Sequence, residues 1–216
     1  MSAKPRILIT GFQPFPGAPY NPTEKLVERL LRLRRPAFDT IGRIGHVFPV
    51  TYGAIDRQLP ALIETHSPDA LLMFGLATRT PFVRVETRAR NTITQIWPDA
   101  EHTQVRSRSI VAHSDSTRRF GPHTLRLLRA AQLSGVDARL SLNAGYYLCN
   151  YLSWRAIEAT HVAGGPRLAS FIHVPLVPRG PAQNAGVSGR VTFEQLVGAG
   201  EAMLMETARL ARHWAV

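Results

Sequence analysis

The chain has 216 residues, of which 44% are hydrophobic and 19% are charged. This balance excludes an intrinsically disordered chain and predicts one globular domain over residues 1–216. No apolar run approaches the roughly 20 residues that a membrane-spanning helix needs. No apolar secretory leader follows Met1, so we expect a cytoplasmic protein without a membrane partner. The lone cysteine, Cys149, excludes an intrachain disulfide and fits a reducing compartment.

The charge is strongly positive, because 26 lysines and arginines against 15 acidic residues give a net charge of +11. Such an excess is typical of proteins that bind nucleic acid or other acidic partners. However, the arginines are spread along the chain, and no run of basic residues exceeds two. We therefore expect an arginine-rich composition rather than a nucleic-acid site.

The first third of the chain alternates apolar strand patterns with helical ones. It is predicted to contain strands at residues 6–10 and 70–74, one or two strands within 38–50, and helices from Pro22 and over 54–64. The strand at 70–74 is expected to stop at Gly75. Because strands and helices alternate, we expect an α/β fold: a three-layer α/β/α sandwich around a twisted, largely parallel (mixed) sheet.

A loop rich in glycine and proline follows the first predicted strand and carries Phe12, Phe15 and Asn21. One interpretation places these three side chains in a ligand pocket above the carboxyl end of that strand. The other is a tight turn with aromatic packing, in which Asn21 caps the helix that Pro22 begins.

Charged residues alternate with small or apolar ones over residues 83–91. On one strand this spacing would put Glu86 on the same face as Arg84, Arg88 and Arg90. Opposite charges nearby would favour the carboxylate form. A solvated strand face with ordinary ion pairs is the alternative.

The middle of the chain is predicted to hold a loop over the site at residues 92–109 and a helix over 122–133. The apolar side of this helix is expected to carry Leu125, Leu128 and Leu133. Three histidines in this region lack the spacing of metal ligands and are interpreted as surface or structural residues: His102, His113 and His123. A long final helix is predicted over 192–213.

Cys149 follows a short buried strand predicted at 139–142 and a turn, and it falls in the first turns of a predicted helix. Backbone N–H groups converge at such a position, and the helix dipole favours a thiolate there. The alternative is a small buried side chain without chemistry, which is common for free cysteines. His173 is a candidate base, because it lies near the carboxyl end of the apolar strand pattern at 168–178.

Four segments of the sequence stand out: residues 11–15 with 21–22 (GFQPF and NP), 75–91 around Glu86, 143–150 (NAGYYLCN) and 171–175 (FIHVP). Together these segments resemble the pyroglutamyl peptidase I family of cysteine peptidases. They occur in the order of the family and span nearly the whole chain. The resemblance implies that Cys149 is the nucleophile, that His173 is its base, and that Glu86 orients the imidazole.

The resemblance also implies a substrate and a pocket. The expected substrates are peptides with an N-terminal pyroglutamyl residue, cleaved without a metal or organic cofactor by a homo-oligomer. The lactam ring is neutral, small and flat, so its pocket should be apolar with a few polar groups. The residues expected to form it are Phe12, Phe15, Asn21, Leu76, Tyr147 and Leu148.

The sequence departs from the family pattern at several positions. Thr78 and Arg79 replace a glycine pair, Pro16 replaces another glycine, and Leu76 replaces a glutamine. Beside Glu86, Arg84 replaces a small hydroxyl residue and Thr87 replaces a basic residue. Ile96 stands where the family carries an arginine that helps to stabilise the oxyanion. The arginines expected to substitute for it are Arg79, Arg88 and Arg90.

Two other functions stay open at this level. A related cysteine amidohydrolase would use the same residues on a different N-terminal or cyclic amide. A non-catalytic nucleic-acid-binding protein on the same scaffold would bind in a strongly salt-dependent way and would tolerate loss of Cys149.

Overall fold

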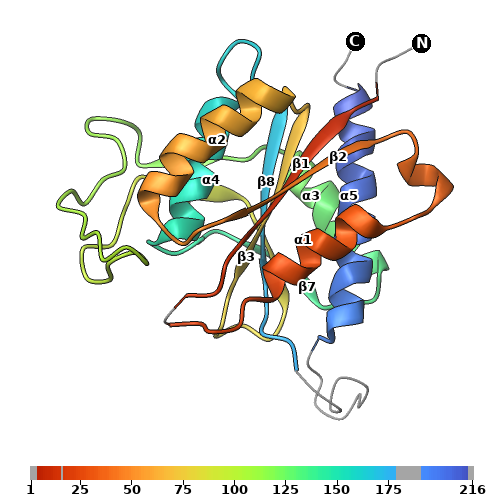
Figure 1. The fold of residues 1–216 in the computed structure, drawn as a ribbon, viewed down its shortest axis with the longest axis horizontal. Helices are drawn as coiled ribbons and strands as arrows, with labels where there is room; N and C mark the ends of the chain where they lie inside the picture. The colour runs from red at the N-terminus through yellow and green to blue at the C-terminus, as the bar shows by residue number, and fades with distance from the viewer. Residues whose placement is uncertain (1–3, 16, 179–190, 214–216) are drawn as a thin grey trace.

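The computed structural model describes residues 4–15, 17–178 and 191–213, so Pro16 lies outside the described residues. Its centre is a six-stranded mixed sheet (Figure 1). In spatial order the strands are β2 (Gly42–Phe48), β1 (Arg6–Phe12), β3 (Ala70–Leu76), β8 (Leu168–Val174), β4 (Val83–Glu86) and β7 (Ala138–Ser141). Neighbouring strands are parallel except that β4 runs antiparallel to β8.

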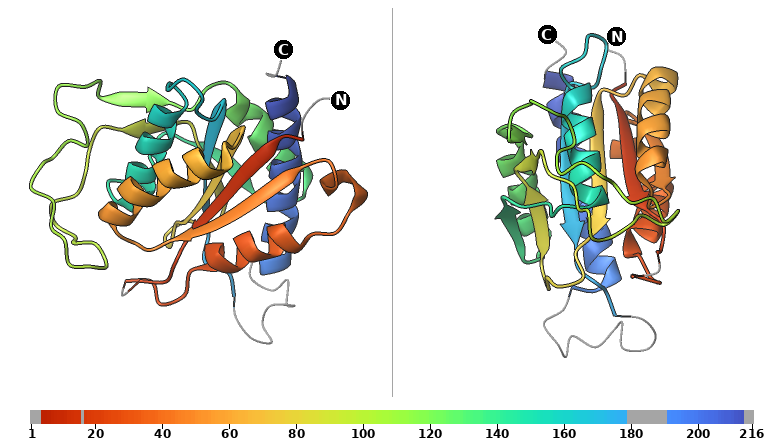
Figure 2. Two further views of the ribbon diagram at one scale, coloured as in Figure 1. Left: turned by 45° about the horizontal axis from the view of Figure 1, so that its top comes forward. Right: turned by 90° about the vertical axis from the view of Figure 1, so that its left-hand side faces the viewer.

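Helices cover both faces of this sheet, which confirms the predicted three-layer arrangement (Figures 1 and 2). One face carries α1 (Pro22–Arg32), α3 (His123–Leu133) and α5 (Phe193–His213), and the other carries α2 (Tyr52–His66) and α4 (Leu148–Ala159). A short 3-10 helix spans Pro36–Phe38, and a separate two-stranded sheet pairs β5 (Arg88–Arg90) with β6 (Thr117–Arg119). None of the helices within the described ranges is long and apolar enough to cross a membrane.

Side chains on the central strands alternate between two hydrophobic cores, one on each face of the sheet. In β8, Ile172 packs in the core below α1, α3 and α5, whereas Phe171 packs in the core below α2 and α4. The same alternation turns His173 toward the α2 and α4 layer. Val85 packs in the core below α1, α3 and α5. Glu86, one residue further along β4, therefore faces the opposite layer, that of α2 and α4, as His173 does. The pleat and the pairing of β4 with β8 together bring an imidazole and a carboxylate to one side of the sheet.

The helices begin in different ways. The Asn21 side chain accepts from the backbone N–H of Thr23 at 3.1 Å and caps α1, and the Thr51 hydroxyl accepts from Ala54 N–H at 3.2 Å and caps α2. No side chain caps α4, where Tyr147 occupies the capping position. The first backbone N–H groups of α4 thus stay available to another acceptor.

Two predicted strands differ from the structure. The strand at 70–74 does not stop at Gly75 but continues to Leu76, because β3 and β8 stay paired to that point. The strand predicted as buried at 139–142 is β7, which lies at the edge of the sheet, and Leu140 is 43% exposed. An edge strand lacks a neighbour on one side, which its sequence does not reveal.

Residues 84–90 do not form the single strand that their alternating charges suggested. β4 ends at Glu86, and Thr87 donates its N–H and its hydroxyl to the carbonyl of Ser141. The chain then leaves the main sheet and continues as β5 in the small sheet. Arg88 and Arg90 consequently do not share a strand face with Glu86.

The prediction for helix 122–133 was right in extent and wrong in its buried face. Leu125 and Leu133 are 58% and 77% exposed, whereas Leu127 and Ala131 are fully buried. Leu128, the third leucine of the predicted face, is partly buried against the core. Apolar residues occur on more than one side of this helix, so contact with its neighbour α5 decides which side is covered.

The orientation of α3 can be tested with a matched pair of leucines. We expect Leu127→Ala to lower the free energy of unfolding by about 2–5 kcal/mol, because it leaves a cavity in the core. Leu125→Ala should change it by less than about 0.5 kcal/mol, because that side chain lies at the surface. Urea denaturation of both variants makes the comparison. Equal losses would contradict the observed orientation.

Candidate active site

A carboxylate–imidazole pair links β4 to β8. Glu86 Oε1 lies 2.7 Å from His173 Nδ1, and both side chains are buried, with Glu86 at 0% exposure. The two strands are antiparallel neighbours in which Arg84 opposes His173. Since Nδ1 faces Glu86, that nitrogen carries the proton and donates it to the carboxylate. Nε2 is then the ring nitrogen that can accept a proton from another group.

Arg84 completes this cluster. Its Nη2 lies 3.1 Å from His173 Nδ1 and 3.3 Å from Glu86 Oε1. A guanidinium has no acceptor, and an Nδ1 that donates to Glu86 has no free lone pair. Arg84 therefore makes its ion pair with the carboxylate and lies beside the imidazole ring. Of the three arginines predicted around Glu86, only Arg84 is there.

Cys149 is the second residue of α4 and lies over the carboxyl end of β3. A Cβ atom added at Gly75 would stand 2.8 Å from Cys149 Sγ and 2.6 Å from the ring of Phe171. Gly75 is in turn the register partner of His173 across β3 and β8. The sulfur thus occupies the space that the missing side chain of Gly75 leaves, beside the strand position of His173.

Burial shapes the protonation of this site. It raises the pKa of the Cys149 thiol to about 12, helped by the Glu86 charge and opposed by the charge of Arg84 and the backbone N–H of Cys149. Burial also lowers the pKa of His173, against the effect of its hydrogen bond to Glu86 and together with the repulsion from Arg84. The resting site accordingly holds a neutral thiol and a neutral imidazole, which can accept the thiol proton.

A cavity of about 710 Å³ opens above these residues. It is lined by Cys149, His173, Arg84 and all six residues predicted for the substrate pocket: Phe12, Phe15, Asn21, Leu76, Tyr147 and Leu148. Phe15 and Tyr147 form a tilted aromatic pair in its wall, with ring centroids 6.5 Å apart. Asn21 fits both the pocket and the helix-cap interpretation. It borders the cavity, and its side chain caps α1 and donates to the carbonyl of Gln13.

The arginines predicted to support an oxyanion lie in different places. Arg79 borders the cavity and is exposed. Arg88 donates to the carbonyl of Leu142, and Arg90 donates to Asn143, so both brace the segment that leads into α4 rather than the cavity. Ile96 is 78% exposed and does not line the cavity.

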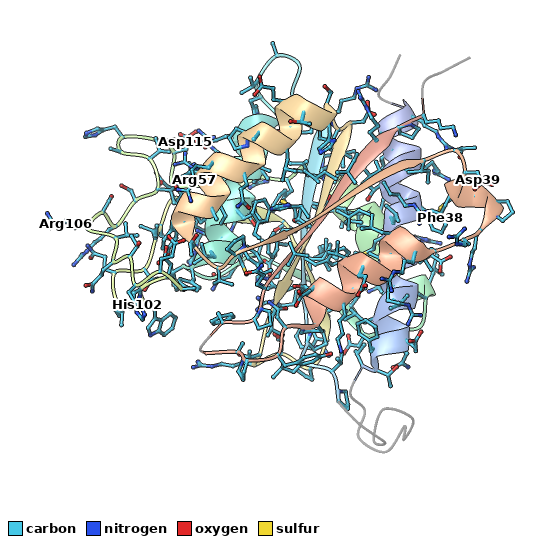
Figure 3. All side chains as sticks on the ribbon, viewed as in Figure 1. Phe38, Asp39, Arg57, His102, Arg106 and Asp115 are labelled. Atoms are coloured by element: carbon cyan, nitrogen blue, oxygen red, sulfur yellow. The ribbon has the colours of Figure 1, made fainter. Side chains whose placement is uncertain are left out.

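The segment between β5 and β6 forms one wall of the cavity, as predicted. It contributes Trp97, Pro98, Asp99, Ala100 and His102, and it projects beyond α2 and α4 (Figure 3). The Asp99 carboxylate accepts from the N–H groups of Tyr52, Glu101 and Thr103. The hydroxyl of Tyr147 donates to the carbonyl of Pro98. This wall is therefore attached to α2 and to the start of α4.

Sequence reasoning missed two residues of the site, Asn150 and Asp99, and it missed the contact of Arg84 with His173. Asn150 is fully buried and fixes the chain beside α4, since its side chain bonds the backbone of Arg90 and Thr92. Asp99 anchors the wall through three backbone N–H groups. The signal for Asn150 was a polar residue inside an apolar helical pattern directly after the cysteine.

No convergence of three or more His, Cys, Asp or Glu side chains that could hold a metal occurs in the described part of the chain. A second cavity of about 630 Å³ lies between α2 and α4, next to Asp56 and Arg155, and contains none of the predicted site residues.

Comparison with known proteins gives a consistent result. A family model described as pyroglutamyl peptidase matches residues 5–208. A pyrrolidone-carboxylate peptidase from Vibrio vulnificus is 31% identical over 212 residues, which cover 96% of each chain. One from Pyrococcus furiosus is 30% identical over 173 residues, 80% of this chain and 82% of that protein. The solved structure of the Thermococcus litoralis pyrrolidone carboxyl peptidase has a TM-score of 0.84 at 26% identity, covering 97% of this chain and 96% of that one.

The close approach of Cys149 to Gly75 predicts a specific steric cost. We expect Gly75→Ala to lower the free energy of unfolding by about 1–3 kcal/mol through overlap with Sγ and with Phe171. Gly198→Ala is the matched control, because nothing lies within 4 Å of its added Cβ. In the interior of α5 it should stabilise by about 0.5–1 kcal/mol. The double variant Gly75→Ala/Cys149→Ala, which removes the sulfur, should recover part of the lost free energy of unfolding. If denaturant unfolding shows instead that the losses of the two single variants add up in the double variant, the contact between Gly75 and Cys149 Sγ is contradicted.

The raised pKa of Cys149 predicts slow alkylation at neutral pH. Iodoacetamide has one thiol to modify, because the chain has one cysteine. The rate in the native protein should still rise between about pH 8 and 10, whereas the unfolded chain should level off once its thiol, with a pKa of about 8.5, is ionised. Mass spectrometry of timed samples measures both profiles. A plateau below about pH 8 in the native protein would show a resting thiolate instead.

Proposed function

Because the chain belongs to the pyroglutamyl peptidase family, we propose that it hydrolyses the amide bond after an N-terminal pyroglutamyl residue. One observation carries most of the support. The hydrogen-bonded pair of Glu86 and His173 lies on the sheet face that α4 covers with Cys149. Carboxylate, imidazole and thiol in this arrangement are what nucleophilic catalysis by cysteine requires.

The proposed reaction has two halves. Cys149 Sγ attacks the acyl carbon of the pyroglutamyl residue while His173 Nε2 takes the thiol proton. The imidazolium then donates that proton to the leaving amine, and the C–N bond breaks to give a thioester. Water attacks the thioester with His173 again as base, which releases pyroglutamate and restores the thiol. Glu86 keeps Nδ1 protonated throughout and stabilises the imidazolium while it exists.

The start of α4 is the proposed oxyanion site. Negative charge develops on the carbonyl oxygen during attack, and the backbone N–H of Cys149 lies in the uncapped first turn of the helix. A donor fixed by the backbone needs no reorganisation at the moment of reaction. One such donor is typically worth about 10²–10³ in rate.

The cavity fits a flat, neutral lactam. Phe12, Phe15 and Tyr147 supply aromatic surface, and Leu76 and Leu148 supply aliphatic surface. The Asn21 amide has a second N–H beyond the one that bonds Gln13, and we assign it to the ring carbonyl of the substrate. Specificity then comes from shape and one polar contact rather than from charge.

We also propose a domain organisation, a cellular location and an oligomeric state. Residues 1–216 form one peptidase domain, which is supported by the family match over residues 5–208 and by one sheet that includes strands from Arg6 to Val174. A cytoplasmic location is supported by the single, free cysteine. A homo-oligomer rests on the family resemblance alone, and light scattering of the purified protein measures it.

Turnover of a fluorogenic pyroglutamyl amide under reducing conditions tests the proposed function. The wild type should hydrolyse it, and Cys149→Ala should not. Glu86→Gln should lower kcat/KM by about 10²–10⁴, because the imidazole loses its orienting carboxylate. The folded state of each variant is checked by its unfolding midpoint. A folded wild type without turnover would contradict the proposal.

A substrate panel separates the proposed peptidase from a related amidohydrolase. Prolyl amides lack the ring carbonyl, and glutamyl amides lack the ring. Both should be cleaved far more slowly than the pyroglutamyl amide, because the flat apolar pocket favours the neutral lactam. Equal cleavage of the three would show that the pocket does not select the lactam.

A further inference from the structure

Arg84 has no part in the mechanism above, yet it lies against two residues of the proposed triad. It precedes Glu86 by two positions on β4, so both side chains point to the same face of the sheet. It is also the register partner of His173 on β8. Its side chain is 23% exposed and borders the cavity. The backbone of two paired strands, rather than a flexible loop, fixes it there.

The contacts of Arg84 give its charge a definite effect. Nη2 shares Oε1 of Glu86 with the imidazole, at 3.3 Å from the oxygen and 3.1 Å from His173 Nδ1. A positive charge this close to the ring opposes a second positive charge on it. The ion pair also keeps the Glu86 carboxylate from turning away from the ring. Both effects act on His173, and neither requires Arg84 to touch the substrate.

We propose that Arg84 is a positioning residue of the site: it holds the Glu86 carboxylate against His173, and its charge keeps the imidazole neutral and able to accept a proton. The role of His173 as a base rests on the proposed function, whereas the effect of Arg84 on the imidazole does not. The lowered pKa of His173, to which the charge of Arg84 contributes, agrees with this assignment.

Other charged and titratable groups face His173 from β4, from α4 and from the rim of the cavity. β4 contributes Glu86 and Arg84, and α4 contributes Cys149. The cavity rim adds Arg79, Asp99, His102, Tyr146 and Tyr147. Asp99 is engaged with three backbone N–H groups, and Arg79 and His102 are exposed to solvent, which screens their charges. Arg84 is therefore the one cation in direct contact with the ring among the described residues.

The test follows the protonation of His173 in the intact chain. In Cys149→Ala protein with isotope-labelled histidine, NMR titration measures the pKa of His173, and its signal is assigned by its loss in a Cys149→Ala/His173→Gln variant. Adding Arg84→Gln or Arg84→Met should raise that pKa by about one unit, because the neighbouring positive charge is gone. Adding Arg84→Lys should leave it near the starting value. In parallel, the acid limb of kcat/KM should move up by the same amount in Arg84→Gln alone.

Arg139→Gln is the matched control. Arg139 is the register partner of Arg84 on β7, but its guanidinium pairs with Asp137 at the surface. It should not move the titration of His173. An unchanged pKa in both charge-free Arg84 variants, or an equal shift in Arg84→Lys, would overturn the proposal. Absence of turnover in the wild type would instead count against the proposed function, and the NMR titration would still decide the role of Arg84.

Discussion

The hydrogen bond between Glu86 and His173 is the interaction on which the rest of the site depends. A fully buried carboxylate is costly unless it is paired, so β4 has to lie where Glu86 reaches the imidazole of β8. The pairing of β4 with β8 that meets this requirement is the one antiparallel pairing in the six-stranded sheet that the described residues form. The same placement brings Arg84 to the ring and leaves one ring nitrogen free on the side that α4 covers.

Much of this arrangement was predictable because two periodicities carry it. Alternation with period two fixes which side chains of a strand share a face, and the helical pattern after the turn at residues 143–145 places Cys149 in a first turn. That Glu86, His173 and Cys149 belong to one site was implied only by the family resemblance. Both periodicities depend on local sequence, and the alternation of strands and helices predicted the layers. The position of His173 near the end of its strand was confirmed for the same reason.

The contacts that failed prediction depend on which elements become neighbours. The alternating charges continue through Arg88 and Arg90, but the chain turns out of the sheet at Thr87, where it bonds to β7. Arg84 looked like a departure from a family pattern, and only the pairing of β4 with β8 reveals that it contacts the imidazole. The buried face of α3 likewise follows from its packing on α5. No repeating spacing in the sequence indicates which of these strands and helices become neighbours.

The two parts of the site are held by separate sets of bonds, and this separation bears on how such a protein can diverge. Asp99 fixes the cavity wall to α2 and Asn150 fixes the chain beside α4, while Glu86 and His173 are fixed by strand pairing. Exposed residues of the projecting segment, such as Arg106, can then be exchanged without disturbing the pair of Glu86 and His173 (Figure 3). We therefore expect substitutions at the rim to change which substrates fit the cavity while the carboxylate–imidazole pair keeps its place.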